Sequence, residues 1–318
     1  MFKTSVLLLA LLLASPVWAQ APHPPMGGAA RAQAQKPAGD GSDLSRDLRA
    51  RTVLLLEDAA VSLDGVVSYA IEDLTDGDGF ERMSKVPFPT ASIIKLAILY
   101  ELVKRADEKS LTLDDTIVLD RKRAVPGGLL YELGTPTLSL RDYANAMIIE
   151  SDNTATNVLI AHLGMDAITA RMEKLGLASI KLRRYMIDLD AAKKGRENVA
   201  TAADIGRLLR IFHKAEGLSP AAQSEALTIL RKHKNTAVRK AVPAGVAIAS
   251  KTGGLEGVRG EAAIVYAKNR PFVIVVLTTY LQEDGAGDKA IERLAQVAYG
   301  YFARLGAAAP ETGRQLYR

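Results

Sequence analysis

The sequence predicts an α/β chain of the α+β type with two lobes: an antiparallel sheet built from N- and C-terminal segments and flanked by helices, and a second, all-helical lobe. Segments rich in β-branched residues lie near both ends of the chain, and stretches with helical periodicity occupy its middle. The simplest way to complete a sheet is to bring the two end segments together, which leaves the middle of the chain as a separate lobe. A cleft between two lobes is a natural place for a binding site.

The N-terminus has the pattern of an export signal. Lys3 supplies a positive charge, residues 6–14 form an apolar run, and Val17-Trp18-Ala19 fits a cleavage site with the cut after Ala19. The run is too short for a comfortable membrane span, and an uncleaved anchor is the alternative interpretation. We therefore expect residues 1–19 to be a signal peptide and the protein to be periplasmic or secreted.

The elements that follow are expected in a fixed order. Residues 20–42 are rich in Ala, Pro, Gly and Gln, which is typical of a flexible linker. The folded domain is expected at 43–304, with a sheet lobe at about 43–89 and 205–304, a helical lobe at about 90–204, and a tail at 305–318. Within it we expect helices at 43–59, 90–106, 140–150, 153–163, 166–175, from 201 and at 288–304, strands at 66–73, 80–83, 246–252, 262–267 and 272–280, an extended piece at 180–186 and an irregular loop at 187–200.

Composition excludes several classes of function. The formal net charge is only +5, and basic residues alternate with acidic ones, so we interpret the charges as a mixed, solvated surface and expect no nucleic-acid partner. The chain has no cysteine, which excludes disulfides, thiolate ligands and a cysteine nucleophile. None of the four histidines is spaced as a helical zinc pair, and we expect no metal and no cofactor.

Ser92 and Lys95 form the first motif with chemical potential. Ser92 falls in the first turn of a predicted helix, and Lys95 lies one turn further on the same face. A serine hydroxyl is a weak nucleophile until a base takes its proton, and a partly buried lysine can lose its charge and serve as that base. Taken alone, the pair also fits a helix-start serine beside a surface lysine.

Two further motifs follow in the chain. Ser151-Asp152-Asn153 lies between two predicted helices, where a serine can relay a proton and an asparagine can hold an amide; an N-cap cluster is the structural alternative. Lys251-Thr252-Gly253 ends a predicted strand, where Lys and Thr could bind a carboxylate and Gly allows close backbone approach; a strand-end turn is the alternative.

The three motifs together, in this order, resemble the set of the class A β-lactamases and penicillin-binding proteins. The resemblance extends over residues 43–304 and implies a β-lactamase-like fold. It implies that Ser92 attacks a carbonyl, that Lys95 is the base, and that Ser151 passes the proton to the leaving nitrogen. It also implies the substrate-binding roles: the Asn153 side chain for the substrate amide, Lys251 and Thr252 for the carboxylate, the backbone N–H groups of Ser92 and Gly254 for the oxyanion, and Arg259 as a further candidate for the carboxylate.

One loop departs from the class A pattern. Those enzymes carry a glutamate that activates the deacylating water, and aligning Arg184 with the pattern places Met186 at the position of that glutamate. A thioether cannot take a proton from water. Asp188 and Asp190 are alternative bases, although an aspartate reaches one methylene less far; both also fit solvated loop carboxylates.

The predicted function is therefore a secreted serine hydrolase that forms an acyl-enzyme with β-lactams, most simply a β-lactamase. The alternative is a peptidoglycan D,D-peptidase or a penicillin-binding protein with slow deacylation, so the substrate is a β-lactam or a peptidoglycan-like molecule. A non-catalytic cell-wall module is a third hypothesis, which the three intact motifs oppose. A histidine-based triad is not supported, because no Gly-x-Ser-x-Gly motif is present.

Overall fold

The computed structural model describes residues 43–232 and 236–308, all within one compact unit of the chain. The predicted signal peptide, the linker at 20–42 and most of the predicted tail lie outside the described residues. Within the described ranges, no helix combines the length and the apolar character needed to cross a membrane.

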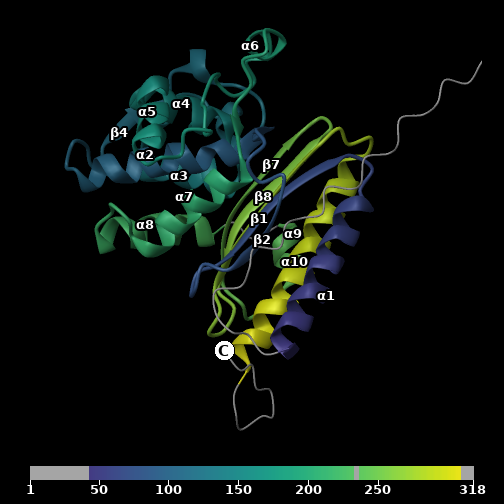
Figure 1. Ribbon diagram of the computed structural model, residues 1–318. Coiled ribbons are helices and arrows are strands. Elements are labelled where there is room, and N and C mark those ends of the chain that lie inside the picture. Colours follow the sequence, from purple (N-terminus) through teal and green to yellow (C-terminus); the bar gives the residue numbers. More distant parts are fainter. Residues whose placement is uncertain (1–42, 233–235, 309–318) are drawn as a thin grey trace, which may run out of the picture. The chain divides into compact units, whose positions relative to one another are not determined.

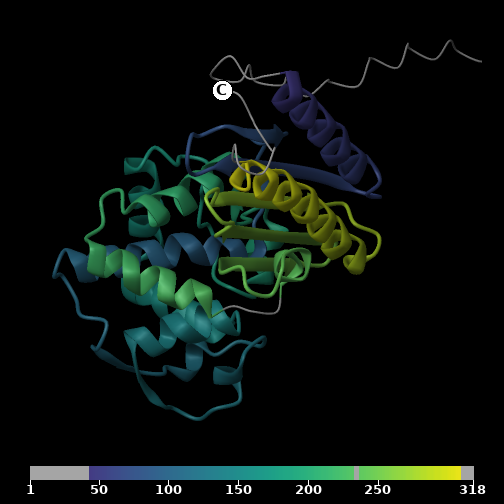
Figure 2. The same cartoon turned by 90° about the horizontal axis from the view of Figure 1, so that it is seen from below.

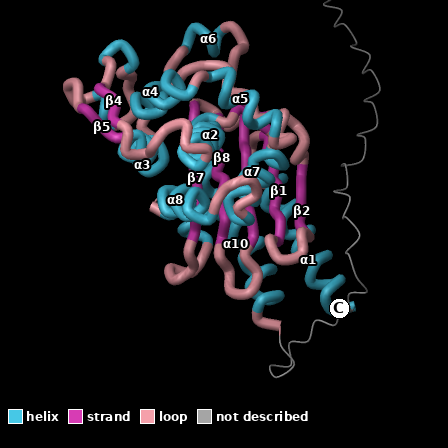
Figure 3. The backbone as a smooth tube through the Cα atoms, turned by 90° about the vertical axis from the view of Figure 1, so that its left-hand side faces the viewer, coloured by secondary structure: helices cyan, strands magenta, loops and turns pink. Residues whose placement is uncertain are grey.

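A five-stranded antiparallel sheet joins the two ends of the domain, which confirms the predicted fold class (Figures 1 and 3). The strand order is β2-β1-β9-β8-β7, so the N-terminal pair lies beside the C-terminal three. The strands are β1 (Val66–Asp73), β2 (Gly79–Arg82), β7 (Ile248–Leu255), β8 (Val258–Val265) and β9 (Phe272–Thr279). Strand β7 is one edge of this sheet.

Each face of the sheet packs against a different set of helices (Figure 2). Helices α1 (Asp43–Val61) and α10 (Asp284–Gly306) cover one face together with the short α9 (Ala237–Ala241). Helix α7 (Ala202–Lys214) covers the other and contacts β1, β8 and β9. Because side chains alternate along a strand, neighbouring residues of β8 enter different cores.

The helical lobe is built around α2 (Lys95–Asp107), whose first nine residues are all buried. Around it lie α3 (Leu140–Ile149), α4 (Asn153–Leu163), α5 (Met165–Lys174) and α8 (Pro220–Arg231), of which α8 comes from the C-terminal half of the chain. Smaller elements complete the described chain: β3 (Phe88–Pro89), β4 (Thr116–Val118), β5 (Thr137–Ser139), β6 (Val199–Ala200), α6 (Leu189–Lys193) and the 3₁₀ helices η1 (Ala91–Ile94), η2 (Arg121–Arg123) and η3 (Leu129–Tyr131).

The predicted helices and strands agree with the structure in some places and differ in others, often where a local sequence signal is present. The helix predicted from residue 140 begins with a capping box, in which the Ser139 hydroxyl accepts from Asp142 N while the Asp142 carboxylate accepts from Ser139 N. Helix α8 was not expected, although Ser219 followed by Pro220 is a helix-start signal. The extended piece at 180–186 is not a strand and makes a single bridge, from Lys181 to Val199. The loop predicted at 187–200 contains the one-turn helix α6.

Candidate active site

Ser92 lies in a tight turn that comes before the long helix of the helical lobe. The sequence predicts one continuous helix here, but residues 91–94 form η1 and the α-helix begins only at Lys95. Ala91, immediately before Ser92, has a φ of 45°. A left-handed conformation at a residue with a Cβ costs about 1–2 kcal/mol, so the surrounding contacts must hold this turn in place.

Gly253 of β7 is one of those contacts. A Cβ at Gly253 would lie 2.6 Å from Thr90 O and 3.1 Å from Ser92 N, so only glycine allows the strand to approach the turn this closely. On the other side, Thr90 N donates to Asn198 O at 3.0 Å. Strand β7 therefore runs directly past the Ser92 backbone N–H, and the first and third motifs are adjacent.

Lys95 joins the first motif to the second. Its side chain is fully buried, and Nζ donates to Ser151 O at 2.6 Å, to Ser151 Oγ at 3.1 Å and to Asn153 Oδ1 at 3.0 Å. Ser151 has a φ of 54°, a conformation that a residue with a side chain adopts only when its surroundings enforce it. The structure thus brings Lys95, Ser151 and Asn153 into direct contact.

The electrostatics around Lys95 favour the neutral amine. Burial lowers the pKa of Lys95 well below its usual range, because a charged ammonium loses its hydration there. The cation of Lys251 lowers the Lys95 pKa further, and the Asp152 carboxylate acts in the opposite direction. Asp152 is itself fixed at the start of α4, where it accepts from Ala155 N at 2.8 Å and from Leu130 N at 2.8 Å.

Lys251 is the second buried lysine of the site. It is fully buried on β7, and its Nζ donates to Thr252 O at 2.9 Å. Burial lowers the Lys251 pKa to about 7, and the Glu261 carboxylate opposes that shift. In the β7–β8 ladder Lys251 pairs with Ala262, on the face toward the helical lobe, whereas Thr252 pairs with Glu261, on the face toward α10. The two side chains of the third motif therefore project to opposite faces of the edge strand.

Asn153 also anchors the loop that precedes the helical-lobe strand β5. Asn153 N donates to Gly127 O at 3.0 Å, and Asn153 Nδ2 donates to Pro126 O at 3.0 Å. With Lys95 on Oδ1, both ends of the side-chain amide are engaged. These contacts use only one of the two Nδ2 hydrogens.

An ion pair between Arg184 and Glu197 joins the two ends of the loop that they bound. Arg184 pairs with Glu197 through Nε–Oε1 at 3.1 Å and Nη2–Oε2 at 2.9 Å, a two-bonded geometry that fixes both side chains. Asn198 strengthens the closure, because its Oδ1 accepts from Arg183 N at 2.7 Å and from Arg184 N at 3.1 Å. Sequence reasoning missed Glu197 and Asn198.

Met186 is held on this loop by α4. Asn157, one turn after Asn153, accepts from Met186 N at 2.8 Å and donates to Met186 O at 3.2 Å. The Met186 side chain is 7% exposed and belongs to the core of the helical lobe. Asn157, one turn after Asn153 on α4, thus holds the backbone of Met186 in place.

Neither Asp188 nor Asp190, the two alternative bases, is seen to bond Lys95 or Ser151. Asp188 caps α6, where its Oδ1 accepts from Ala191 N at 3.0 Å. Asp190 is exposed in the first turn of the same helix. Ile187, between Met186 and Asp188, has a φ of 62°, which is strained for a β-branched residue.

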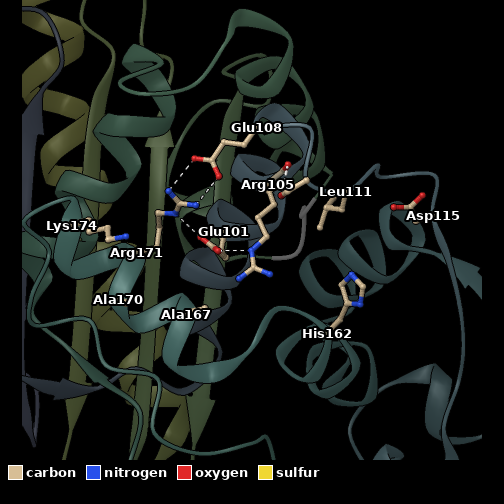
Figure 4. Close-up of a pocket in the computed structure, with 11 residues that line it drawn as sticks. Glu101, Arg105, Glu108, Leu111, Asp115, His162, Ala167, Ala170, Arg171 and Lys174 are labelled. Carbon is tan, nitrogen blue, oxygen red and sulfur yellow. Dashed lines mark hydrogen bonds and ion pairs between the residues drawn. The ribbon is translucent and has the colours of Figure 1, made fainter.

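The helical lobe also contains a surface cavity of about 650 Å³ that lies apart from these residues (Figure 4). Its wall holds the carboxylate of Glu101, which is 2% exposed and accepts from Arg105 Nε at 2.6 Å and from Arg171 Nε at 2.7 Å. Arg171 also donates to both oxygens of Glu108. The network ties α5 to α2 and so supports the helix that carries Lys95. Across the described ranges, no group of three His, Asp or Glu side chains is placed to hold a metal ion.

Comparison with known proteins matches the chain to beta-lactamases, both as a family and as individual relatives. A model of the beta-lactamase enzyme family matches residues 52–302. An imipenem-hydrolyzing beta-lactamase of Enterobacter cloacae is 27% identical over 240 residues, which cover 72% of this chain and 82% of that protein. A beta-lactamase of Streptomyces lavendulae is 28% identical over 279 residues, covering 84% of this chain and 88% of that one.

Solved structures show the same likeness. The beta-lactamase of Sphaerobacter thermophilus has a TM-score of 0.71 with 28% identity and covers 78% of this chain and 95% of its own. PBP-A has a TM-score of 0.73 with 25% identity and covers 78% and 96%. A leucine-to-glutamate variant of PBP-A, solved as an acyl-enzyme complex with penicillin G, has a TM-score of 0.74 with 24% identity and covers 81% and 96%.

Proposed function

The chain belongs to the class A beta-lactamase family, and we propose that it is a serine hydrolase in which β-lactams acylate Ser92 and the acyl-enzyme is released slowly. The observation that carries this proposal is the burial of Lys95, one turn after Ser92, with its amine on Ser151 and Asn153. A buried amine that is easily deprotonated is the base that a serine nucleophile needs.

In the proposed acylation, Ser92 Oγ attacks the lactam carbonyl and its proton passes to the neutral Lys95 amine. The lactam C–N bond then breaks, the Ser151 hydroxyl gives its proton to the leaving nitrogen, and Lys95 returns a proton to Ser151. The contact of 3.1 Å between Lys95 Nζ and Ser151 Oγ supports this relay, because in the neutral amine the same contact can run from the hydroxyl to the lone pair.

The other binding roles follow from the edge strand. The backbone N–H groups of Ser92 and Gly254 are the proposed oxyanion donors, and the close approach at Gly253 supports their proximity. Lys251 is proposed to bind the substrate carboxylate, and Asn153 to bind the side-chain amide. The role expected of Thr252 in carboxylate binding is not proposed, because the Thr252 side chain projects to the opposite face of β7. Arg259 is a weaker candidate for the carboxylate, because its Nη1 already donates to Leu255 O and Val258 O, each at 2.8 Å.

Slow release is proposed because the loop offers no acid where one is needed. Met186 has the position predicted for the deacylating glutamate, and its thioether cannot activate water. Asp188 holds the start of α6 instead. Without a positioned base, attack of water on the ester loses a factor on the order of 10²–10⁴.

The same loop favours a second candidate function. A penicillin-binding protein or peptidoglycan D,D-peptidase would share the acylation chemistry and differ in the lifetime of its β-lactam ester. The observation in its favour is Met186, together with the likeness to PBP-A, whose variant with an introduced glutamate was captured as an acyl-enzyme with penicillin G.

One pair of assays tests both candidates. Purified protein is incubated with a chromogenic cephalosporin to follow hydrolysis and with a fluorescent penicillin to follow stable labelling. Steady turnover supports a β-lactamase, and labelling with little turnover supports the penicillin-binding alternative. Ser92→Ala removes either signal; folded protein that shows neither signal, or a signal that survives Ser92→Ala, contradicts the acyl-enzyme proposal.

We also propose that the protein is exported. Support comes only from the signal-peptide pattern around residues 6–19. Mass spectrometry of the mature protein from the periplasm or medium is expected to give an N-terminus at Gln20. An intact Met1 in the cytoplasmic fraction would contradict export.

A further inference from the structure

A groove with a cavity of about 320 Å³ lies between α1 and α10, the two long helices on the face of the sheet away from the helical lobe (Figure 1). Its floor is largely apolar, because Val297 and Tyr301 of α10 are buried there and Leu48 and Leu55 of α1 are half-buried. The volume is at the lower end of the range for ligand sites. The groove is separate from the residues proposed to act on a β-lactam.

Every charged residue among those that line the groove is an arginine. Arg51 lies on α1, and Arg293 and Arg304 lie on α10. The two arginines of α10 are about three turns apart, so they share one face of the helix and stand roughly 16 Å apart along its axis. All three side chains are exposed. Arginines that face one groove without a carboxylate between them repel one another and attract an anion.

The acids of the same two helices do not neutralise these arginines. Asp47 precedes Arg51 by one turn of α1, but the two are not ion-paired among the described residues. Glu292, the neighbour of Arg293, lines a different cavity beside β8 and accepts from Gln296 Nε2 at 3.2 Å. Arg304 donates only to the backbone oxygen of Gly300 within the described part of the chain. The guanidinium groups are therefore available to carboxylates from outside.

Gly300 keeps the α10 wall of the groove open. Glycine destabilises the interior of a helix relative to alanine, so its presence in the middle of α10 needs a reason. Packing does not supply one, because a Cβ at Gly300 would meet only Nη1 of the flexible Arg304 side chain, at 3.0 Å. The missing side chain instead leaves free space between Arg293 and Arg304.

The chain's own flanking sequences do not match the charge of the groove. Residues 20–42 and residues 309–318 each contain two basic residues and one acidic residue. Neither segment is acidic, so charge complementarity favours an occupant from another molecule.

We propose that the groove between α1 and α10 docks an acidic peptide segment of another protein, in an extended conformation. In such a segment alternate side chains point to opposite sides, and those on one side are roughly 7 Å apart. Carboxylates at alternate positions would meet the arginines at the exposed rim, and the residues between them would reach the apolar floor. Arginine binds carboxylates through two parallel hydrogen bonds, which makes it well suited to this role.

A fluorescent peptide that alternates glutamate with leucine over about seven residues tests the proposal, beside a peptide with glutamine in place of glutamate. Anisotropy with the full-length protein measures both affinities. The acidic peptide should bind at least about tenfold more tightly, and its advantage should shrink as salt is raised, because the contacts are exposed to solvent. Equal affinity of the two peptides would overturn the proposal.

Charge removal tests which cations are used. The joint variant Arg51→Gln, Arg293→Gln, Arg304→Gln should abolish the preference for the acidic peptide. Its matched control is Lys193→Gln, Lys194→Gln, Arg196→Gln, which removes the same charge from three exposed residues on and after α6 and should keep the preference. A preference that survives the first variant, or is lost equally in the second, contradicts a site at this groove.

Filling the groove tests its shape without changing any charge. Gly300→Leu keeps all three arginines and should weaken the acidic peptide at least about tenfold, while the thermal stability of the protein does not fall, because leucine favours the helix. Undiminished binding would place the peptide elsewhere. A dimer in sedimentation that Gly300→Leu abolishes would assign the groove to a second copy of this chain and overturn the proposal. None of these measurements needs acylation of Ser92, so they do not depend on the proposed function.

Discussion

The cluster around Lys95 and the loop around Met186 meet at helix α4, but they use their polar groups differently. In the cluster, a fully buried amine contacts Ser151 and Asn153, and its pKa is far from its usual range. In the loop, the carboxylate of Asp188 caps helix α6, and the residue whose backbone is bound by Asn157 is a methionine. A fully buried amine therefore marks the part of the site proposed for acylation, whereas neither Asp188 nor Asp190, in the part proposed for deacylation, is fully buried.

The largest effect is expected from breaking the cluster. Lys95→Met removes the base and should slow acylation of Ser92 by about a thousandfold or more, while keeping an apolar chain of similar length in the core. The rate of fluorescent penicillin labelling measures it. Lys104→Met on the same helix is the control and should label normally; undiminished labelling of the Lys95 variant would show that another group is the base.

The next effect sharpens the comparison by supplying what the loop lacks. Met186→Glu should shorten the lifetime of the acyl-enzyme by about 10–100-fold, because a carboxylate at this position, whose backbone Asn157 holds in place, can activate water. Acyl-enzyme decay after removal of free penicillin measures it. Ile187→Glu places the same charge one residue later and should leave the lifetime unchanged; an unchanged lifetime in the Met186 variant would contradict the alignment of this loop.

The pH dependence of acylation should reflect the two buried lysines in opposite directions. Lys95 must be neutral to accept a proton, so acylation falls as pH decreases through its lowered pKa. Lys251, with a pKa of about 7, is charged below that pH and neutral above it, so attraction of the substrate carboxylate weakens as pH rises through about 7. The second-order rate of acylation should show a maximum, and Lys251→Gln should remove the alkaline limb. A profile that rises monotonically to pH 9 would rule out this role of Lys251.

The smallest effect is expected at Asp188. Asp188→Asn keeps a capping side chain on α6 and should change the acyl-enzyme lifetime by less than about twofold, with a loss of stability below about 1 kcal/mol. Decay kinetics and thermal unfolding check both. A tenfold longer lifetime would instead make Asp188 the deacylation base.

Much of this arrangement could be predicted from the sequence because it depends on local signals. The strand predicted at 66–73 and the helices predicted from residues 140 and 201 agree with the structure to within a few residues. The order of the three motifs predicted that they form one site, and the structure places Lys95 against Ser151 and Gly253 against the turn of Ser92. The 3₁₀ turn at Ser92 was not predictable, because it is enforced by Gly253, a residue far away in the chain.

Features set by long-range packing were missed for the same reason. Glu101 looks like a surface residue of α2 until Arg171 of α5 is placed beside it. Glu261 follows a glycine in an apolar strand, and only the packing of α9 and α10 reveals that it is buried with one oxygen unpaired. Side chains alternate along β7, so Lys251 and Thr252 project to different faces of the strand, which the Lys-Thr-Gly motif alone does not reveal.

The central claim is that Ser92 is acylated readily and deacylated slowly. Intact-protein mass spectrometry after mixing with penicillin G tests it most directly, by following one protein through both steps. A single adduct should form within seconds, map to Ser92 and decay over many minutes, with a faster decay in Met186→Glu. Hydrolysis of penicillin G at many turnovers per second, without an adduct that accumulates, would contradict the claim, as would an adduct on any other residue.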